Sequence, residues 1–366
     1  MEHNFDARKS QIVKGVAILL MMWHHCFLSG RFDGFTISFF PLTEGQVTLF
    51  AAFCKICVSL FAFVSGYGLF FSYQKWMRDH TSSSCVRWLW QRYVRTFSGY
   101  WLIVVLSWIL CGFLDGRPRT IYVRPSRFLA FIYALIDLLG LSKLLGTPSL
   151  IGTWWYMSAA FVFIVSVPIL YAAMRRFGSI YSYLLLMVIP RMIGGYPGGT
   201  VPLSFLPVFG LGMICADSDF FAKVDRLAKN RMCHAALLVG SVILSCVLCF
   251  ASIRMSNEKF WDLKWDLFPL AFIVCIYLTV SRIPFLNRIL EFLGLHSANV
   301  FMVHTFIRDT YCRSFVYGRG HFILIMATLL GLSLLVSFTL EGLKKLIRYD
   351  RFCAKLEALS FSSAKP

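Results

Sequence analysis

The chain has 366 residues, of which 58% are hydrophobic and only 15% carry a charge. A soluble domain has about 25% charged residues, and the surplus of apolar residues here is spread along the whole chain. One buried core cannot account for it, because several uncharged windows reach the roughly 20 residues that cross a bilayer as a helix. The composition therefore excludes an ordinary soluble domain and predicts an all-α polytopic membrane protein.

The formal net charge of +18 has two interpretations. In a soluble protein it would suggest nucleic acid as a partner. In a membrane protein, basic loops set the orientation of the helices and contact anionic lipid head groups. We therefore expect the lipid bilayer, and no nucleic acid, as the partner of the basic residues.

Ten apolar stretches predict about ten transmembrane helices. In chain order they are residues 11–28, 47–71, 96–114, 154–174, 178–193, 203–216, 233–253, 266–281, 290–307 and 321–341. The stretch 128–145 is interrupted by Asp137 and Lys143, and we interpret it as an interfacial or re-entrant segment. The first run lacks a small-residue cleavage site and is followed by many further spans, so we expect a retained helix rather than a signal peptide.

The distribution of Lys and Arg predicts the orientation of these helices. With the N-terminus inside, the cytoplasmic segments carry the larger basic share, as the positive-inside bias requires. Counting residues 128–145 as a span would put the basic C-terminal tail outside. We therefore expect a multi-pass protein of the inner (cytoplasmic) membrane with both termini cytoplasmic. Its transmembrane domain would be residues 1–341, followed by an amphipathic, basic tail, residues 342–366, along the inner surface.

The first predicted helix carries Lys14, His24 and His25, and ionisable groups within a span are costly and tend to mark sites. Lys14 and His25 are 11 residues apart. Eleven steps of roughly 100° return to nearly the same helical face, about 16 Å further along the axis. Taken singly, Lys14 is explained as a snorkelling cation and His25 as part of a helix–helix hydrogen bond. Their common stripe makes them candidates for one site.

A basic residue, ten further residues and then a histidine resembles the first-helix signature of the acyltransferase-3 family of integral-membrane O-acyltransferases. Later segments resemble other motifs of that family, in the same order along nearly the whole chain. They are "VSLFAFVSGYGLF" (58–70), "RYVR" (92–95), "GTWWYMSAAFVFIVSVPILY" (152–171) and "FLGLHSANVFMVHTF" (292–306). Some members carry an appended C-terminal domain, and we expect none here.

The resemblance implies transfer of an acyl group, commonly acetyl, from cytoplasmic acyl-CoA to a hydroxyl of a carbohydrate. His25 would be the general base that takes the proton of that hydroxyl, or a transient acyl carrier. His24 is the alternative, although the spacing favours His25. The family usually has arginine where this chain has Lys14, which keeps the charge but loses the planar, two-pronged donor. Acetyl-CoA is thus the expected donor, and the acceptor would be an exopolysaccharide, a lipopolysaccharide or a lipid-linked sugar.

Arg92 and Arg95 match the Arg-x-x-Arg motif of the family at the predicted inner end of the third helix. Residues three apart share a helical face, and guanidinium groups bind phosphate oxygens in pairs. We therefore expect both arginines to bind the phosphates of coenzyme A. The thioester would then extend toward His25, with Lys14 and His25 at the lower and upper parts of one acyl-donor channel.

Four other side chains are candidates for the acceptor side. The tetrahedral intermediate of acyl transfer needs hydrogen-bond donors for its oxyanion, and Ser65, Trp154 and Trp155 could supply them. His304 lies late in the ninth predicted helix and would line the acceptor site.

A basic stretch conflicts with the charge bias, because the segment predicted to lie outside contains Arg117, Arg119, Arg124 and Arg127. It is either a tolerated exception or a basic lip that holds an anionic acceptor, such as an acidic polysaccharide or a lipid-linked diphosphate sugar. Lys55, near a predicted outer helix end, is interpreted as a snorkelling lysine.

The main alternative is a polysaccharide transporter or flippase, since ten helices and the interrupted helices of residues 178–216 suit one. The two halves of the chain show no repeated pattern, which such proteins often have. We expect neither a metal site nor a disulfide framework. Cys57, Cys246, Cys249 and Cys275 lie in apolar stretches, where cysteine acts as a small hydrophobic residue.

Overall fold

The computed structural model describes residues 5–79, 85–122, 126–194, 201–254, 263–280 and 283–359. Within these ranges the chain is helical with short connections, and the one pairing of extended segments is an isolated bridge between Ser38 and His321. The all-α class is confirmed. The α-helices are α1 (Ala7–Phe27), α2 (Glu44–Phe53), α3 (Cys57–Asp79), α4 (Cys85–Leu114), α5 (Arg117–Tyr122), α6 (Arg127–Leu138), α7 (Ser142–Leu145), α8 (Trp155–Phe177), α9 (Ser179–Gly194), α10 (Leu206–Asp217), α11 (Phe220–Ala228), α12 (Arg231–Arg254), α13 (Phe268–Val280), α14 (Pro284–Thr305), α15 (Arg313–Tyr317), α16 (Phe322–Leu346) and α17 (Tyr349–Ala358).

Short helices of other types interrupt or extend this set. The 3₁₀ helices are η1 (Cys54–Ile56), η2 (Gly152–Trp154) and η3 (Pro202–Phe205), and the π-helices are η5 (Leu263–Leu267) and η6 (Phe306–Tyr311). Among them, η1 and η6 adjoin helices that carry cavity residues. η1 separates α2 from α3, and η6 continues α14 beyond Thr305.

All ten predicted segments lie on helices, although their ends differ. The second span begins at Glu44 and continues to Asp79, and the third begins at Cys85, so that its N-terminal end is longer than predicted. Of the helices described, four are long and apolar enough to cross a membrane alone, and a bent pair of helices makes a fifth if it is one span. The remaining predicted spans are shorter or more polar over their described parts.

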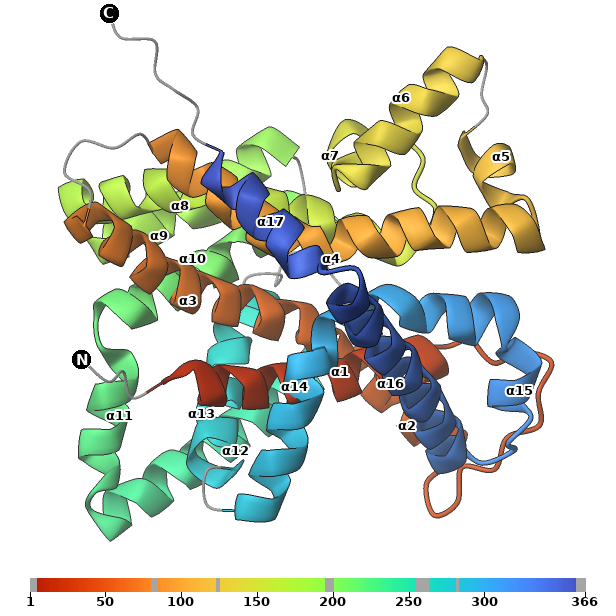
Figure 1. Ribbon diagram of the computed structural model, residues 1–366. Helices are drawn as coiled ribbons and strands as arrows, with labels where there is room; N and C mark the ends of the chain where they lie inside the picture. The colour runs from red at the N-terminus through yellow and green to blue at the C-terminus, as the bar shows by residue number, and fades with distance from the viewer. Residues whose placement is uncertain are drawn as a thin grey trace, which may run out of the picture.

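The segment predicted to be interfacial or re-entrant forms the short helices α6 and α7, which lie with α5 beside one end of α4 (Figure 1). Asp137, which interrupts the apolar pattern here, is 1% exposed. Its carboxylate accepts hydrogen bonds from the Tyr122 hydroxyl (2.5 Å), the Ser142 hydroxyl (2.8 Å) and the Leu150 amide (2.8 Å). The aspartate therefore ties the short helices together.

The helix α1 runs from the N-terminal edge into the middle of the molecule and packs most extensively against α14 (Figure 1). The contact is close because two glycines face the opposite backbone. A Cβ atom on Gly15 would come within 2.0 Å of the Leu290 carbonyl oxygen, and one on Gly294 within 2.0 Å of the Gln11 carbonyl oxygen. Small residues that let backbones approach in this way are typical of helix pairs in membranes. This close contact, a seam between the two helices, fixes the positions of Lys14 and His25 along the axis of α14.

The helices α3 and α10 form a second seam of the same kind. A Cβ atom on Gly66 would lie 2.0 Å from the Phe209 carbonyl oxygen, and one on Gly212 would lie 2.2 Å from that of Phe63. Ser65 therefore lies on α3 beside the face that packs against α10. In the Ser65–Gly66 pair, the serine provides a polar group on one face of the helix and the glycine allows the close contact on the adjacent face.

The C-terminal tail continues α16 to Leu346 and then forms α17, which lies across α4 (Figure 1). The Trp90 indole N–H donates to the Leu356 carbonyl oxygen (2.7 Å), and Arg95 Nε lies 2.6 Å from Glu357 Oε2. The last helix is thus held against the N-terminal half of α4.

Candidate active site

A cavity of about 730 Å³ lies between α1, α3, α4, α8 and α14. Apolar side chains make up most of its wall, among them Phe61, Phe163 and Phe301. Polar groups enter it from each of the five helices. They are Lys14 and His25 of α1, Ser65 of α3, Arg92 and Thr96 of α4, Trp155 and Tyr156 of α8, and Ser297 of α14. Mostly apolar walls with a few converging polar groups are typical of small-molecule sites.

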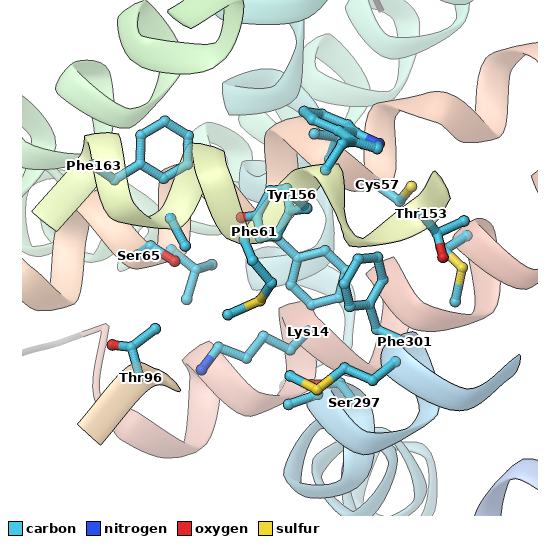
Figure 2. Close-up of a pocket in the computed structure, with 18 of the residues that line it drawn as sticks. Lys14, Cys57, Phe61, Ser65, Thr96, Thr153, Tyr156, Phe163, Ser297 and Phe301 are labelled. Atoms are coloured by element: carbon cyan, nitrogen blue, oxygen red, sulfur yellow. The ribbon is translucent and has the colours of Figure 1, made fainter. Parts of the chain in front are cut away.

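The directions of the helices define two ends of this cavity. The helices α1 and α4 run one way past it, and α3 and α8 run the other way (Figure 1). Lys14 and Arg92 therefore lie toward one end, which we call the cation end. His25 lies toward the other, which we call the histidine end. Figure 2 shows Lys14 and Thr96 toward the first end, and Thr153 and Cys57 toward the second.

The cation end presents two positive charges, with Glu357 of α17 near enough to act on one of them, Arg92. Lys14 is half-buried and its side chain extends into the cavity (Figure 2), while the Arg92 guanidinium lies 5.8 Å from the centre of the Trp88 ring. Among the described residues, neither forms an ion pair with a carboxylate. Charges taken from water into a protein normally find a partner. This end can therefore accept an anionic group from solution.

The histidine end brings together three imidazole rings that lie far apart in the sequence. The centre of the His25 ring is 5.2 Å from that of His24 and 4.9 Å from that of His304. His24 Nδ1 lies 2.7 Å from the Ala51 carbonyl oxygen, so His24 is held by α2. Among the described residues, no hydrogen bond engages the ring nitrogens of His25. Both ring nitrogens of His25 therefore stay available to a bound molecule, whereas His24, which also lines the cavity, has its Nδ1 bonded to α2.

His304 is fully buried and fixed in orientation. Its Nδ1 lies 2.7 Å from the Phe301 carbonyl oxygen, which requires the proton on that nitrogen. Its Nε2 then accepts from the Thr305 hydroxyl at 3.2 Å, and Thr305 is 3.2 Å from the Thr153 hydroxyl. Since Thr153 lines the cavity, a short chain of hydroxyl groups joins His304 to it. His304 therefore does not line the histidine end but packs behind the residues that do.

Arg308, which the sequence analysis did not single out, lies in η6 and is 1% exposed. It pairs with Asp309 and donates from Nη1 to the Tyr317 hydroxyl (3.4 Å), and Tyr317 in turn donates to the Cys26 carbonyl oxygen (3.1 Å). This chain of contacts holds the end of α1 beside His25. The one available signal was its position four residues after His304, on the same helical face.

Of the three expected oxyanion donors, the structure places two at the cavity and one away from it. Ser65 and Trp155 line the cavity, and the Tyr156 hydroxyl interacts with Ser65. Trp154 is 2% exposed, and its indole N–H donates to the Met302 carbonyl oxygen at 3.2 Å. That donor is already used, so Trp154 positions α8 against α14 instead of facing a substrate. Tyr156 and Thr153, one residue to either side of the tryptophan pair, are cavity residues that sequence reasoning missed.

The paired arginines are also separated. Arg92 lines the cavity, whereas Arg95 is exposed and pairs with Glu357 of α17. Three helical steps turn through about 300°, so the two side chains point about 60° apart. Because of this angle, Arg92 points into the cavity and Arg95 points toward α17 of the C-terminal tail.

The basic stretch expected to form a lip does not reach the cavity in its described part. Arg117 lies 3.2 Å from Asp115 and donates to Thr310 (3.1 Å), and Arg119 and Arg127 are exposed. Arg124 lies outside the described residues. By contrast, Lys55 and Arg31 line the cavity at the histidine end.

The cysteines include two Cys-x-x-Cys pairs, Cys54 with Cys57 and Cys246 with Cys249. All twelve are free thiols. Over the part of the chain that the structure describes, no three side chains of His, Cys, Asp or Glu gather as a metal site would require.

Long apolar helices around a mostly apolar cavity with a few polar groups define an integral-membrane protein with a small-molecule site. A family model described as an acyltransferase domain matches residues 9–342, nearly the whole chain. The chain therefore belongs to the acyltransferase-3 family, whose common activity is membrane acyl transfer. Neither a curated protein nor a solved structure matches it.

Proposed function

We propose that this protein transfers an acyl group, foremost acetyl, from cytoplasmic acyl-CoA to a hydroxyl of a carbohydrate, with His25 as the general base. The observation that carries the proposal is the single cavity that has Lys14 and Arg92 at one end and His25 at the other. A molecule that is anionic at one end and reactive at the other matches this arrangement. Acyl-CoA is such a molecule.

The donor would bind with its phosphates at the cation end. Charge-assisted contacts to phosphate are the strong hydrogen bonds of proteins, and neither cation forms an ion pair with a carboxylate among the described residues. The largely apolar wall between the two ends suits the uncharged pantetheine arm. The thioester would then lie beside His25.

At the histidine end, the neutral His25 ring would take the proton of the acceptor hydroxyl as its oxygen attacks the thioester carbonyl carbon. The resulting oxyanion needs donors, and the Ser65 hydroxyl and the Trp155 indole N–H line the same cavity. The intermediate collapses by breaking the carbon–sulfur bond. The proton on His25 then passes to the departing thiolate, which leaves as free coenzyme A, and the base is regenerated.

The acceptor would enter from the histidine end, opposite to the cytoplasmic donor. This arrangement suits a carbohydrate of the cell envelope, such as an exopolysaccharide, a lipopolysaccharide or a lipid-linked sugar. It goes with the orientation expected from the charges, in which the protein crosses the inner membrane many times and both termini are cytoplasmic.

The test is transfer of a labelled acetyl group by purified protein in lipid nanodiscs, with a glycoside as acceptor and free coenzyme A measured in parallel. We expect equal amounts of acetylated glycoside and free coenzyme A, and loss of both in His25→Ala. His296→Ala is the matched control, because that histidine also lies in the bundle but bonds to Ser337 away from the cavity. Uptake of glycoside into sealed proteoliposomes without acetylation would instead support a transporter.

A further inference from the structure

The cavity wall carries more cations than the proposed binding of the acyl-CoA phosphates requires. Four cations line it, Lys14, Arg31, Lys55 and Arg92, and no Asp or Glu is among its described lining residues. Lys14 and Arg92 occupy the cation end, where the phosphates of coenzyme A are proposed to bind. Arg31 and Lys55 lie at the other end, where the proposed donor has no phosphate.

Arg31 and Lys55 approach the histidine end from two different elements. Arg31 follows the C-terminus of α1, six residues after His25. Lys55 lies in η1, the break between α2 and α3, next to the α2 residue Ala51 that holds His24. Both charges lie close enough to act on the His24 ring. They therefore border the place where the acceptor hydroxyl would meet His25.

Neither cation is neutralised by the described part of the protein. No carboxylate there forms an ion pair with Arg31 or Lys55, although exposed arginines such as Arg95 and Arg175 do find acidic partners. The Lys55 ammonium, half-buried, lies 5.6 Å from the centre of the Trp265 ring, a contact that positions the charge without cancelling it. A short 3₁₀ break within a long helical span is also often a functional feature.

A neutral sugar would gain little from two unpaired cations, because its hydroxyl groups bond equally well to uncharged side chains. An anionic group would gain charge-assisted bonds to both. From this placement we propose that the histidine end is an anion subsite, in which Arg31 and Lys55 bind a carboxylate or phosphate of the acceptor adjacent to the hydroxyl that is acylated. This inference rests on the proposed function for the position of the hydroxyl. It assigns the acceptor to the class of acidic or phosphate-linked carbohydrates.

Direct binding tests the subsite independently of catalysis. The probes are methyl glucoside, which is neutral, methyl glucuronide, which carries a carboxylate, and glucose 1-phosphate. Each would be titrated by calorimetry into the full-length protein in nanodiscs without acyl donor. We expect at least one anionic probe to bind about 10-fold or more tightly than the neutral one, with a preference that weakens as salt is raised. Preference for the glucuronide identifies an acidic sugar, and preference for the phosphate identifies a phosphate-linked one.

Variants that remove the charge of Arg31 or Lys55, and variants that keep it, distinguish an anion subsite from a purely structural role of these residues. Arg31→Gln and Lys55→Gln should each weaken the anionic probe about 10- to 100-fold and leave the neutral probe and acetyl-CoA unchanged. Arg31→Lys and Lys55→Arg should restore most of the affinity. Arg119→Gln, which removes an exposed arginine outside the cavity, is the matched control and should change nothing.

The outcomes distinguish the subsite from the proposed function. Equal or undetectable binding of all three probes, or equal losses for neutral and anionic probes in the glutamine variants, would overturn the subsite even if acetyl transfer is observed. A clear anionic preference with no acetyl transfer to any probe would retain the subsite and overturn the acyltransferase proposal.

Discussion

The two ends of the cavity are made of different kinds of polar group. At the cation end, Lys14 and Arg92 are long side chains without acidic partners among the described residues. At the histidine end, His24 and His304 are short, planar side chains fixed by backbone carbonyl groups, with His25 between them. The first arrangement provides charge alone, whereas the second adds to the charges of Arg31 and Lys55 three rings that lie side by side.

The difference indicates a division of labour. Unpaired flexible cations provide binding energy to an anion, and their loss should appear in affinity. A ring held in place by packed neighbours provides an oriented proton acceptor, and its loss should appear in the rate of the chemical step. Both ends depend on α1, which carries Lys14 at one and His25 at the other, and α1 depends on its glycine seam with α14.

The largest effect should come from breaking that seam, because both ends then fail together. In Gly15→Leu the new side chain would enter the backbone of α14 at Leu290, where even a Cβ atom would be only 2.0 Å from the carbonyl oxygen. We expect loss of acetyl transfer, loss of acetyl-CoA binding and a lower melting temperature in detergent.

Gly112→Leu is the control for this prediction, since a Cβ atom on that glycine of α4 meets open space. It should bind acetyl-CoA and melt as the unaltered protein does. Normal binding and stability in Gly15→Leu would show that the close approach of α1 and α14 is not required.

A smaller effect, confined to the cation end, is expected for Lys14. Lys14→Ala removes one charge-assisted contact, worth roughly 1.5–3 kcal/mol, and should weaken acetyl-CoA binding about 10- to 150-fold. Lys14→Arg should bind nearly as well as the unaltered protein, because arginine keeps the charge and presents its donors as a planar pair. Equilibrium binding of labelled acetyl-CoA measures both, and unchanged affinity in Lys14→Ala would remove the lysine from the donor site.

The smallest effect is expected for Arg95, although it shares a motif with Arg92. Its ion pair with Glu357 is solvent-exposed, and such pairs contribute about 0–1 kcal/mol. Arg95→Ala should therefore change acetyl-CoA affinity by less than about 5-fold and should loosen α17, which limited proteolysis of the tail would detect. A loss as large as that of Lys14→Ala would instead place Arg95 in the donor site.

The sequence was sufficient for the features that depend on local periodicity. Apolar windows located ten segments that all lie on helices, and a spacing of 11 residues placed Lys14 and His25 on one stripe of α1. The motif order also led to the family whose model spans residues 9–342. Each of these inferences uses residues within one helix or their order along the chain.

What could not be predicted depends on contacts between distant segments. Gly15 meets Leu290 and Gly294 meets Gln11 across more than 270 residues, and no local pattern reports such a pairing. Lys55 read as an ordinary helix-end lysine because the 3₁₀ break that turns it toward the cavity has no clear sequence signal. Trp154 and Trp155 are adjacent and chemically alike, yet only the fold decides which indole faces the cavity.

The division of labour between the two ends is tested most directly by acetyl transfer measured against acetyl-CoA concentration for Arg92→Ala and His25→Ala. Arg92→Ala should raise the half-saturating concentration about 10- to 150-fold and recover nearly the full rate at saturation. His25→Ala should leave half-saturation unchanged and lower the maximal rate about 10²- to 10⁴-fold. If His25→Ala instead keeps near-normal turnover at saturating donor, or if both variants lose maximal rate at unchanged half-saturation, the two ends do not divide binding from chemistry.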